Sequence, residues 1–203
     1  MTQAGYYDYT PTVTLLRPVA LIGHPGCAYR EVAYDLAALT GLTLHDFDHR
    51  VEHDVGQTLW SFARQNGRDE LYRLEEALLP GLLTQSPPGI IVLGEGALHR
   101  PEQLTRVQAQ ATLLFFHLPR TTCYWALRRR QEERGGVLMH PWLPDRLDGP
   151  QDLQPFLEGM RPAAAAADRV VDMEGQGVHE VVLELQQWLP ALDKRRKMEK
   201  TGC

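Results

Sequence analysis

The octapeptide GHPGCAYR, residues 23–30, has the spacing of a phosphate-binding loop. An apolar run at 18–22 precedes it and predicts a buried strand, and the amphipathic pattern at 31–39 predicts a helix. A glycine turn between a strand and the start of a helix presents backbone N–H groups to an anion. Gly23 and Gly26 would form that turn, so the chemistry to consider first is the binding or transfer of phosphate.

The octapeptide departs from the nucleotide-binding pattern, Gly-x-x-x-x-Gly-Lys-Ser/Thr, at its last three positions. Ala28 replaces the second glycine, Tyr29 the lysine that neutralises the phosphates, and Arg30 the hydroxyl residue that holds Mg²⁺. All three lysines of the chain lie at 194–200, too late to substitute. Arg30 could replace the lysine or be exposed in the first helical turn, and Tyr29 could fill the phosphate site or pack against the helix. Cys27 could be a reactive thiol or a small residue suited to a tight loop.

Two acids follow a second predicted strand, at 42–45. Asp46 and Asp48 could hold a cation and accept a hydroxyl proton, or they could cap the helix that starts near His49. His45, His49 and His53 recur every four residues. A strand end and a helix start would place them on different faces, which disfavours a shared metal ion.

The remaining pattern alternates between short apolar runs and amphipathic segments. It predicts strands at 90–93, 111–117 and 170–172, and helices at 49–66, 69–84, 100–109, 120–134 and 178–189. Such alternation predicts an α/β fold of three layers, a parallel β-sheet with helices on both faces. Ligands bind beyond the carboxyl ends of such strands, so the loops at 23–30, 46–48 and 94–96 are expected to meet.

Composition and charge limit the class of protein. A chain of 203 residues that is 43% hydrophobic suits one globular domain, and no apolar run is long enough to span a membrane. Three cysteines without paired spacing favour a reducing compartment, so we expect a cytoplasmic protein. Residues 1–193 hold 16 arginines against 25 acids, which disfavours nucleic acid as a partner.

These segments, in this order, resemble the shikimate kinase family of small P-loop kinases over about residues 17–190. The segments that carry the resemblance are LIGHPGCAYR, LHDFDHRVE, GRDELYRLEEALL, IIVLGEGAL and RGGVLMHPWLP. It implies a P-loop kinase domain at 17–190 with a lid at about 131–150. An N-terminal extension would then occupy 1–16 and a basic tail 191–203.

The resemblance also implies roles for single positions. Asp46 matches the aspartate that helps to place Mg²⁺, and Asp48 matches the catalytic aspartate that binds the substrate hydroxyls. Gly94 and Gly96 match the outer glycines of a Gly-Gly-Gly stretch. Glu95 replaces the middle glycine, against which the substrate packs.

The arginines of the family pattern are replaced. Tyr72 stands where an arginine binds the substrate carboxylate, although Arg73 is adjacent. His140 replaces the lid arginine, while Arg134 keeps the approach to the lid basic. A second carboxylate-binding arginine falls in an alanine run, with Arg161 as the nearest substitute.

Departures on both the nucleotide side and the acceptor side predict a protein that does not transfer phosphate. It would instead act by binding a small molecule or a protein partner. The alternative is an active ATP-dependent small-molecule kinase with an altered phosphate loop, and only then are ATP and Mg²⁺ its cofactors.

Ligand and lid can be predicted on the same grounds. Without nucleotide nothing favours closure, so the lid is predicted to be mobile or to fold differently from a nucleotide-clamping lid. A ligand is expected on the acceptor side, between Asp48, Arg73 and Gly94–Gly96. Because Glu95 adds negative charge, that ligand should be neutral or cationic.

Overall fold

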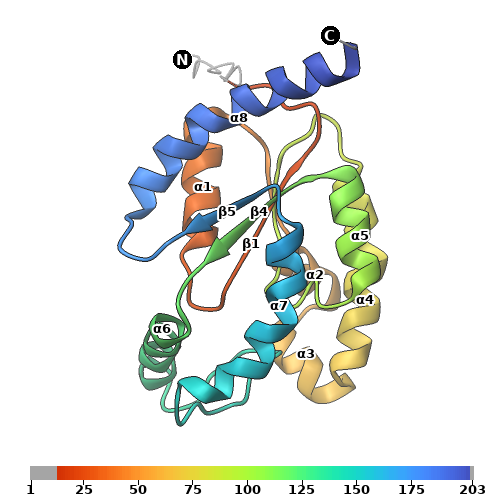
Figure 1. The fold of residues 1–203 in the computed structure, drawn as a ribbon. Helices are drawn as coiled ribbons and strands as arrows, with labels where there is room; N and C mark the ends of the chain where they lie inside the picture. Colours follow the sequence, from red (N-terminus) through yellow and green to blue (C-terminus); the bar gives the residue numbers. More distant parts are fainter. Residues whose placement is uncertain (1–12, 202–203) are drawn as a thin grey trace, which may run out of the picture.

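The computed structural model of the protein describes residues 13–201 (Figure 1). Most of the predicted N-terminal extension, at 1–12, and the side chains of the predicted basic tail, from 191 onward, lie outside the described part. Within residues 13–201, no helix combines the length and the apolar character that crossing a membrane requires.

A five-stranded sheet forms the centre of the molecule, with strand order β2-β3-β1-β4-β5 and parallel pairing throughout. The strands are β1 (Val19–Gly23), β2 (Leu44–Asp46), β3 (Ile90–Val92), β4 (Thr112–His117) and β5 (Arg169–Asp172). The three central strands are buried along nearly their whole length, which explains their uninterrupted apolar sequences. The predicted parallel α/β sheet is confirmed.

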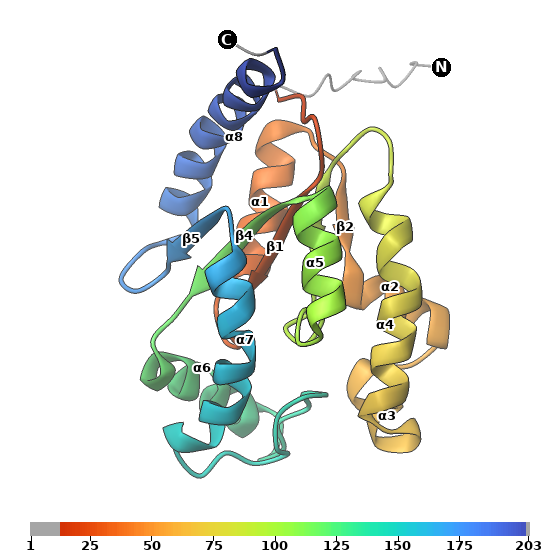
Figure 2. The same cartoon turned by 45° about the vertical axis from the view of Figure 1, so that its right-hand side comes forward.

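Helices cover both faces of this sheet. Figures 1 and 2 show α1 and α8 together on one face, and α5 and α7 on the other. The helices are α1 (Tyr29–Thr40), α2 (Phe47–Val55), α3 (Leu59–Asn66), α4 (Arg68–Leu83), α5 (Pro101–Gln110), α6 (Arg120–Glu133), α7 (Gln154–Ala166) and α8 (Val178–Thr201), with a 3₁₀ turn η1 at Pro150–Leu153. The expected three-layer arrangement is therefore present.

Two helices differ from their predicted bounds. The helix predicted at 49–66 is two helices, because Gly56 ends α2 with a left-handed φ of +68° and the Thr58 side chain caps α3 by accepting from the Ser61 N–H. The last helix continues to Thr201, well beyond the predicted end at residue 189.

Candidate functional site

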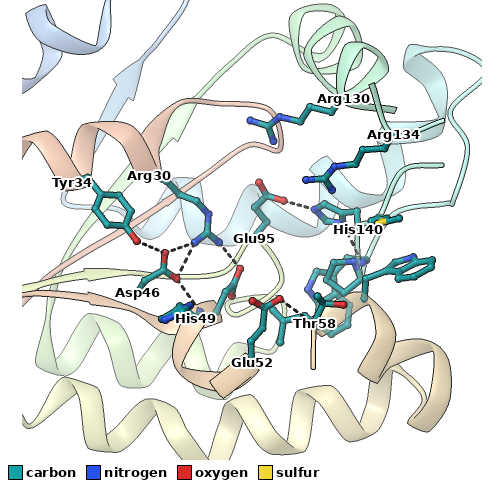
Figure 3. Close-up of a pocket in the computed structure, with 16 residues that line it drawn as sticks. Arg30, Tyr34, Asp46, His49, Glu52, Thr58, Glu95, Arg130, Arg134 and His140 are labelled. Carbon is teal, nitrogen blue, oxygen red and sulfur yellow. Dashed lines mark hydrogen bonds and ion pairs between the residues drawn. The ribbon is translucent and has the colours of Figure 1, made fainter. Parts of the chain in front are cut away.

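The carboxyl ends of β1, β2 and β3 meet at a cavity of about 550 Å³. Figure 3 shows side chains from α1, α2, the loop after β3, α6 and the lid segment (residues 131–150) around it. The structure thus brings together the loops that were expected to converge. Its lining includes Arg30, Asp46, Asp48, Glu95, Arg130, Arg134, His140 and Trp142.

The loop between β1 and α1 keeps its tight turn. Gly26 has a φ of +83°, and the Cys27 N–H donates to the His24 carbonyl at 3.0 Å. The Cys27 side chain is buried, and burial raises the pKa of its thiol to about 12. Cys27 is therefore a packed neutral thiol and not a reactive one.

Tyr29, at the lysine position, lies in the hydrophobic core. Its side chain is fully buried, and its hydroxyl donates to the Leu93 carbonyl at 2.9 Å. The ring lies beside Phe116, with 6.2 Å between ring centroids, and a Cβ at Gly23 would come within 2.9 Å of it. Of the two alternatives for Tyr29, the structure shows packing. The residue that matches the phosphate-binding lysine does not face the cavity.

Arg30 pairs with both aspartates of the site. One guanidinium nitrogen lies 3.0 Å from each carboxylate oxygen of Asp46, and the other contacts Asp48. The Arg30 side chain is 29% exposed, so the prediction of an exposed residue is wrong. The physical reason is that two carboxylates lie beside the first turn of α1, where a guanidinium fork can satisfy both.

Asp46 and Asp48 differ in what their side chains do. Asp46 caps α2 by accepting from the His49 N–H at 3.1 Å, and it also accepts from the Tyr34 hydroxyl at 3.2 Å. Burial raises the pKa of Asp48 to about 6, against the opposing effect of Arg30. Both acids therefore belong to one polar site, and Asp46 also caps a helix.

The residues around Asp46 do not fit Mg²⁺. A Mg²⁺ site needs oxygen ligands with room for bound water. Here the guanidinium of Arg30 lies against both carboxylates, and the phosphate loop offers no hydroxyl at that position. Among residues 13–201 the structure gathers no group of three or more His, Cys, Asp or Glu side chains around a possible metal position.

Glycine is required at the two outer positions of the loop after β3. A Cβ at Gly94 would overlap the carboxylate of Asp48, and a Cβ at Gly96 would overlap the indole of Trp142. That indole stacks on Tyr72, with 4.3 Å between ring centroids. The predicted acceptor residues Asp48, Tyr72, Gly94 and Gly96 therefore share one region, together with an aromatic residue that sequence reasoning missed.

Glu95 and His140, at the middle-glycine and lid-arginine positions, form a pair. His140 Nδ1 lies 3.2 Å from the backbone nitrogens of Trp142 and Leu143, so it accepts, and Nε2 carries the proton that is donated to Glu95. Burial raises the pKa of Glu95, but the His140 hydrogen bond and the positive charge of Arg30 outweigh it, and the net pKa lies below its usual value.

Two arginines proposed for the acceptor pocket lie elsewhere. Arg73 is exposed and pairs with Glu70 on the same helix. Arg161 lies on α7 and lines a separate cavity. The expectation for Arg73 is wrong because helical spacing turns Tyr72 inward and Arg73 outward along α4. The expectation for Arg161 is wrong because α7 places it at the other cavity. Arg134, predicted to lie at the lid, faces the main cavity (Figure 3).

Glu75 is the buried acid that sequence reasoning did not select. It is 3% exposed, and neither carboxylate oxygen has a hydrogen-bond partner among the described residues. Burial, followed by the charge of Asp48, raises the pKa of Glu75 well above its ordinary value. Its position one helical turn after Tyr72 was the available signal.

The free energy of unfolding should therefore fall as pH rises. In Glu75→Gln this free energy should depend less steeply on pH. Folded Glu75 keeps its proton at a pH where the unfolded chain releases it. The stabilisation is thus complete below the unfolded pKa and is lost as pH rises through the folded pKa, by up to about 1.4 kcal/mol per pH unit. Urea unfolding from pH 5 to pH 8 measures this slope. Glu76→Gln, on the same helix, is the control, and an unchanged slope in Glu75→Gln would contradict the assignment.

Comparison with known proteins places the chain in a family. The family model described as "Shikimate kinase" matches residues 25–190. The chain belongs to the shikimate kinase family. It is similar to the shikimate kinase of Paracidovorax citrulli, at 30% identity over 49% of this chain and 55% of that protein. It is also similar to the shikimate kinase of Mycobacterium ulcerans, at 30% identity over 40% of this chain and 44% of that protein. These matches span about half the length of each curated relative.

Solved structures of the family share the fold. The shikimate kinase from Acinetobacter baumannii in complex with shikimate has a TM-score of 0.71 at 20% identity, over 85% of this chain and 92% of that chain. A gluconokinase from Sinorhizobium meliloti 1021 has a TM-score of 0.59 at 14% identity, over 92% of this chain and 99% of that chain. At these identities the likeness establishes the fold only, so the activity of this shikimate kinase family member has to be argued from its own site.

Proposed function

We propose that this member of the shikimate kinase family does not transfer phosphate from ATP and acts by binding a small molecule, or a side chain of a protein partner, at the cavity. The observation that carries the proposal is the Arg30 guanidinium between Asp46 and Asp48. It places a fixed protein cation where the family pattern implies Mg²⁺, so the position between the two acids is already held by a positive charge.

The replacement of cationic residues on the nucleotide side supports the claim that the protein does not transfer phosphate. Phosphoryl transfer depends on positioning and on neutralising charge, and one cationic side chain at the transferred group is worth about 10³- to 10⁵-fold in rate. Tyr29 is buried in the core, and His140 donates to Glu95. Neither side chain is available to a phosphate.

The cavity itself supports the claim that the protein acts by binding a ligand. Its volume of about 550 Å³ suits a small molecule. The two carboxylates of Asp46 and Asp48 outnumber the single guanidinium of Arg30, and Glu95 stays ionised because its pKa is lowered. A ligand with several hydrogen-bond donors would suit these acids better than a carboxylate would, which agrees with the expectation of a neutral or cationic molecule.

One observation favours the alternative of an active ATP-dependent kinase. Arg130 and Arg134 face the cavity and form no ion pair with any residue in the described part of the chain. Two such guanidinium groups could contact phosphate oxygens. The alternative therefore needs a direct test.

Calorimetric titration with Mg·ATP, ADP and shikimate in turn tests the proposal. We expect no micromolar, Mg²⁺-dependent binding of ATP, because the cation position is held by Arg30 and the lysine position is buried. A coupled assay of ADP release with shikimate as acceptor should show no turnover. Tight Mg·ATP binding followed by turnover would establish the alternative. Thermal shift against neutral and cationic metabolites then tests the binding role, with Asp48→Asn as the variant expected to lose the response.

A further inference from the structure

Trp142 of the lid segment fills the part of the acceptor side between Gly96 and Tyr72, and it forms a wall of the open cavity. Its side chain is only 8% exposed and stacks on Tyr72, with the rings inclined by 28°. The indole lies so close to Gly96 that any side chain there would collide with it. The chain's own tryptophan thus lies against the glycine next to the position on which, by the family resemblance, a substrate packs.

Polar contacts hold the backbone on both sides of Trp142. Arg68, on α4, donates to the carbonyls of Pro141 at 2.9 Å and Leu143 at 3.3 Å. His140 Nδ1 accepts from the N–H groups of Trp142 and Leu143. The middle of the lid segment is therefore hydrogen-bonded to α4.

The lid segment is also fastened at two further points. His140 donates to Glu95 of the loop after β3, and both side chains are 13% exposed. Asp145 accepts from the Trp60 indole N–H at 3.2 Å and pairs with Arg64, both on α3. Where the sequence predicted a mobile or rearranged lid, the structure shows a segment that contacts α3, α4 and the loop after β3 of the same chain.

The replaced positions contact one another. His140, at the lid-arginine position, bonds Glu95, at the middle-glycine position, and Tyr72, at the carboxylate-arginine position, stacks on Trp142. A phosphate-clamping lid closes because ligand phosphates favour the closed state, since a ligand shifts an equilibrium only by its differential affinity. In this chain the lid segment makes its contacts with α3, α4 and the loop after β3.

We propose that the lid segment is an autoinhibitory closure: contacts within the chain hold it closed, Trp142 occupies the space between Gly96 and Tyr72, and a ligand that reaches that space must displace Trp142. The proposal goes beyond the proposed function because it concerns access to the site, whichever chemistry takes place there. The hydrogen bond between His140 and Glu95 holds the lid segment to the loop after β3, and we call this pair the latch. The ring of Tyr72 is the surface on which the Trp142 indole packs.

Hydrogen–deuterium exchange of the unliganded, full-length protein tests the closure. Amides of Leu138 and Leu147, which bond to the Asp145 carbonyl and the Gln131 side chain, should be protected. Gly96→Ala should expel Trp142, and Glu95→Gln should weaken the latch. Each should speed exchange in residues 138–147 by about 10- to 100-fold, the effect of losing a charged hydrogen bond, while β4 stays protected.

Gly81→Ala is the matched control, because a Cβ at Gly81, on α4, meets nothing within 4 Å. It should leave lid exchange unchanged. Unprotected lid amides in the unmodified protein, or no response to Gly96→Ala, would overturn the proposal. The experiment contains no ATP, so its outcome is independent of the calorimetric test.

Chemical rescue provides a second readout. Trp142→Ala should leave an indole-shaped space on Tyr72, and added indole should restore lid protection and raise the melting temperature. The same indole added to the unmodified protein should have no effect, because Trp142 fills the space. Failure of indole to restore protection in Trp142→Ala would contradict the claim that the side chain occupies a ligand-sized site.

Discussion

Replacing Tyr29 with alanine is expected to lower the free energy of unfolding by about 3–5 kcal/mol, the range for removing a large aromatic side chain from a core. Tyr29 is fully buried, its ring packs beside Phe116, and its hydroxyl satisfies the Leu93 carbonyl. Alanine leaves a cavity and an unpaired buried carbonyl. Urea unfolding monitored by circular dichroism measures the loss.

Two variants separate the contributions at this position. Tyr29→Phe removes only the hydrogen bond and should cost about 1 kcal/mol. Tyr34→Ala, on the same helix but 50% exposed, should cost much less than Tyr29→Ala. Tyr29→Lys, which restores the residue of the phosphate-binding pattern, should destabilise rather than create a nucleotide site, because it places an amine in the core. A Tyr29→Ala protein as stable as Tyr34→Ala would show that the ring is not a core element.

Replacing Arg30 with serine is expected to destabilise the protein by about 2–3 kcal/mol and to make its stability depend on Mg²⁺. The loss is smaller than for a fully buried pair because the side chains retain some solvent contact. Asp46 and Asp48 would face each other without a cation, beside the hydroxyl of the nucleotide-binding pattern. Millimolar MgCl₂ should then stabilise the variant by binding its folded state, but leave the unmodified protein unchanged.

The pH dependence gives this prediction a further check. Removing Arg30 takes away the positive charge that lowers the pKa of Asp48, so that pKa should rise above about 6. The variant should therefore lose more stability at pH 8 than at pH 5. Arg50→Ala, which breaks an exposed pair with Asp54, is the control and should change little. Equal losses in the two variants, with no effect of MgCl₂, would rule out the role assigned to Arg30.

The sequence by itself determined the strand and helix order, the parallel sheet and the family. These follow from local pattern, since apolar runs and helical periodicity report which faces are buried. It also located the carboxyl-end loops, and the structure places Asp46, Asp48, Gly94 and Gly96 close together at that edge of the sheet. It misplaced Arg73, because a one-residue step along α4 rotates a side chain from the site to solvent.

Only the tertiary structure decided what the unusual residues do. Arg30 reaches Asp46 and Asp48, and His140 reaches Glu95, 45 positions earlier in the chain. The sequence suggested a mobile or differently folded lid because, without nucleotide, nothing was expected to favour closure. Its closure depends instead on single side chains, such as Trp142, that meet partners from α3, α4 and the loop after β3. Such contacts depend on the direction of each side chain and on distances between remote segments, which periodicity does not encode.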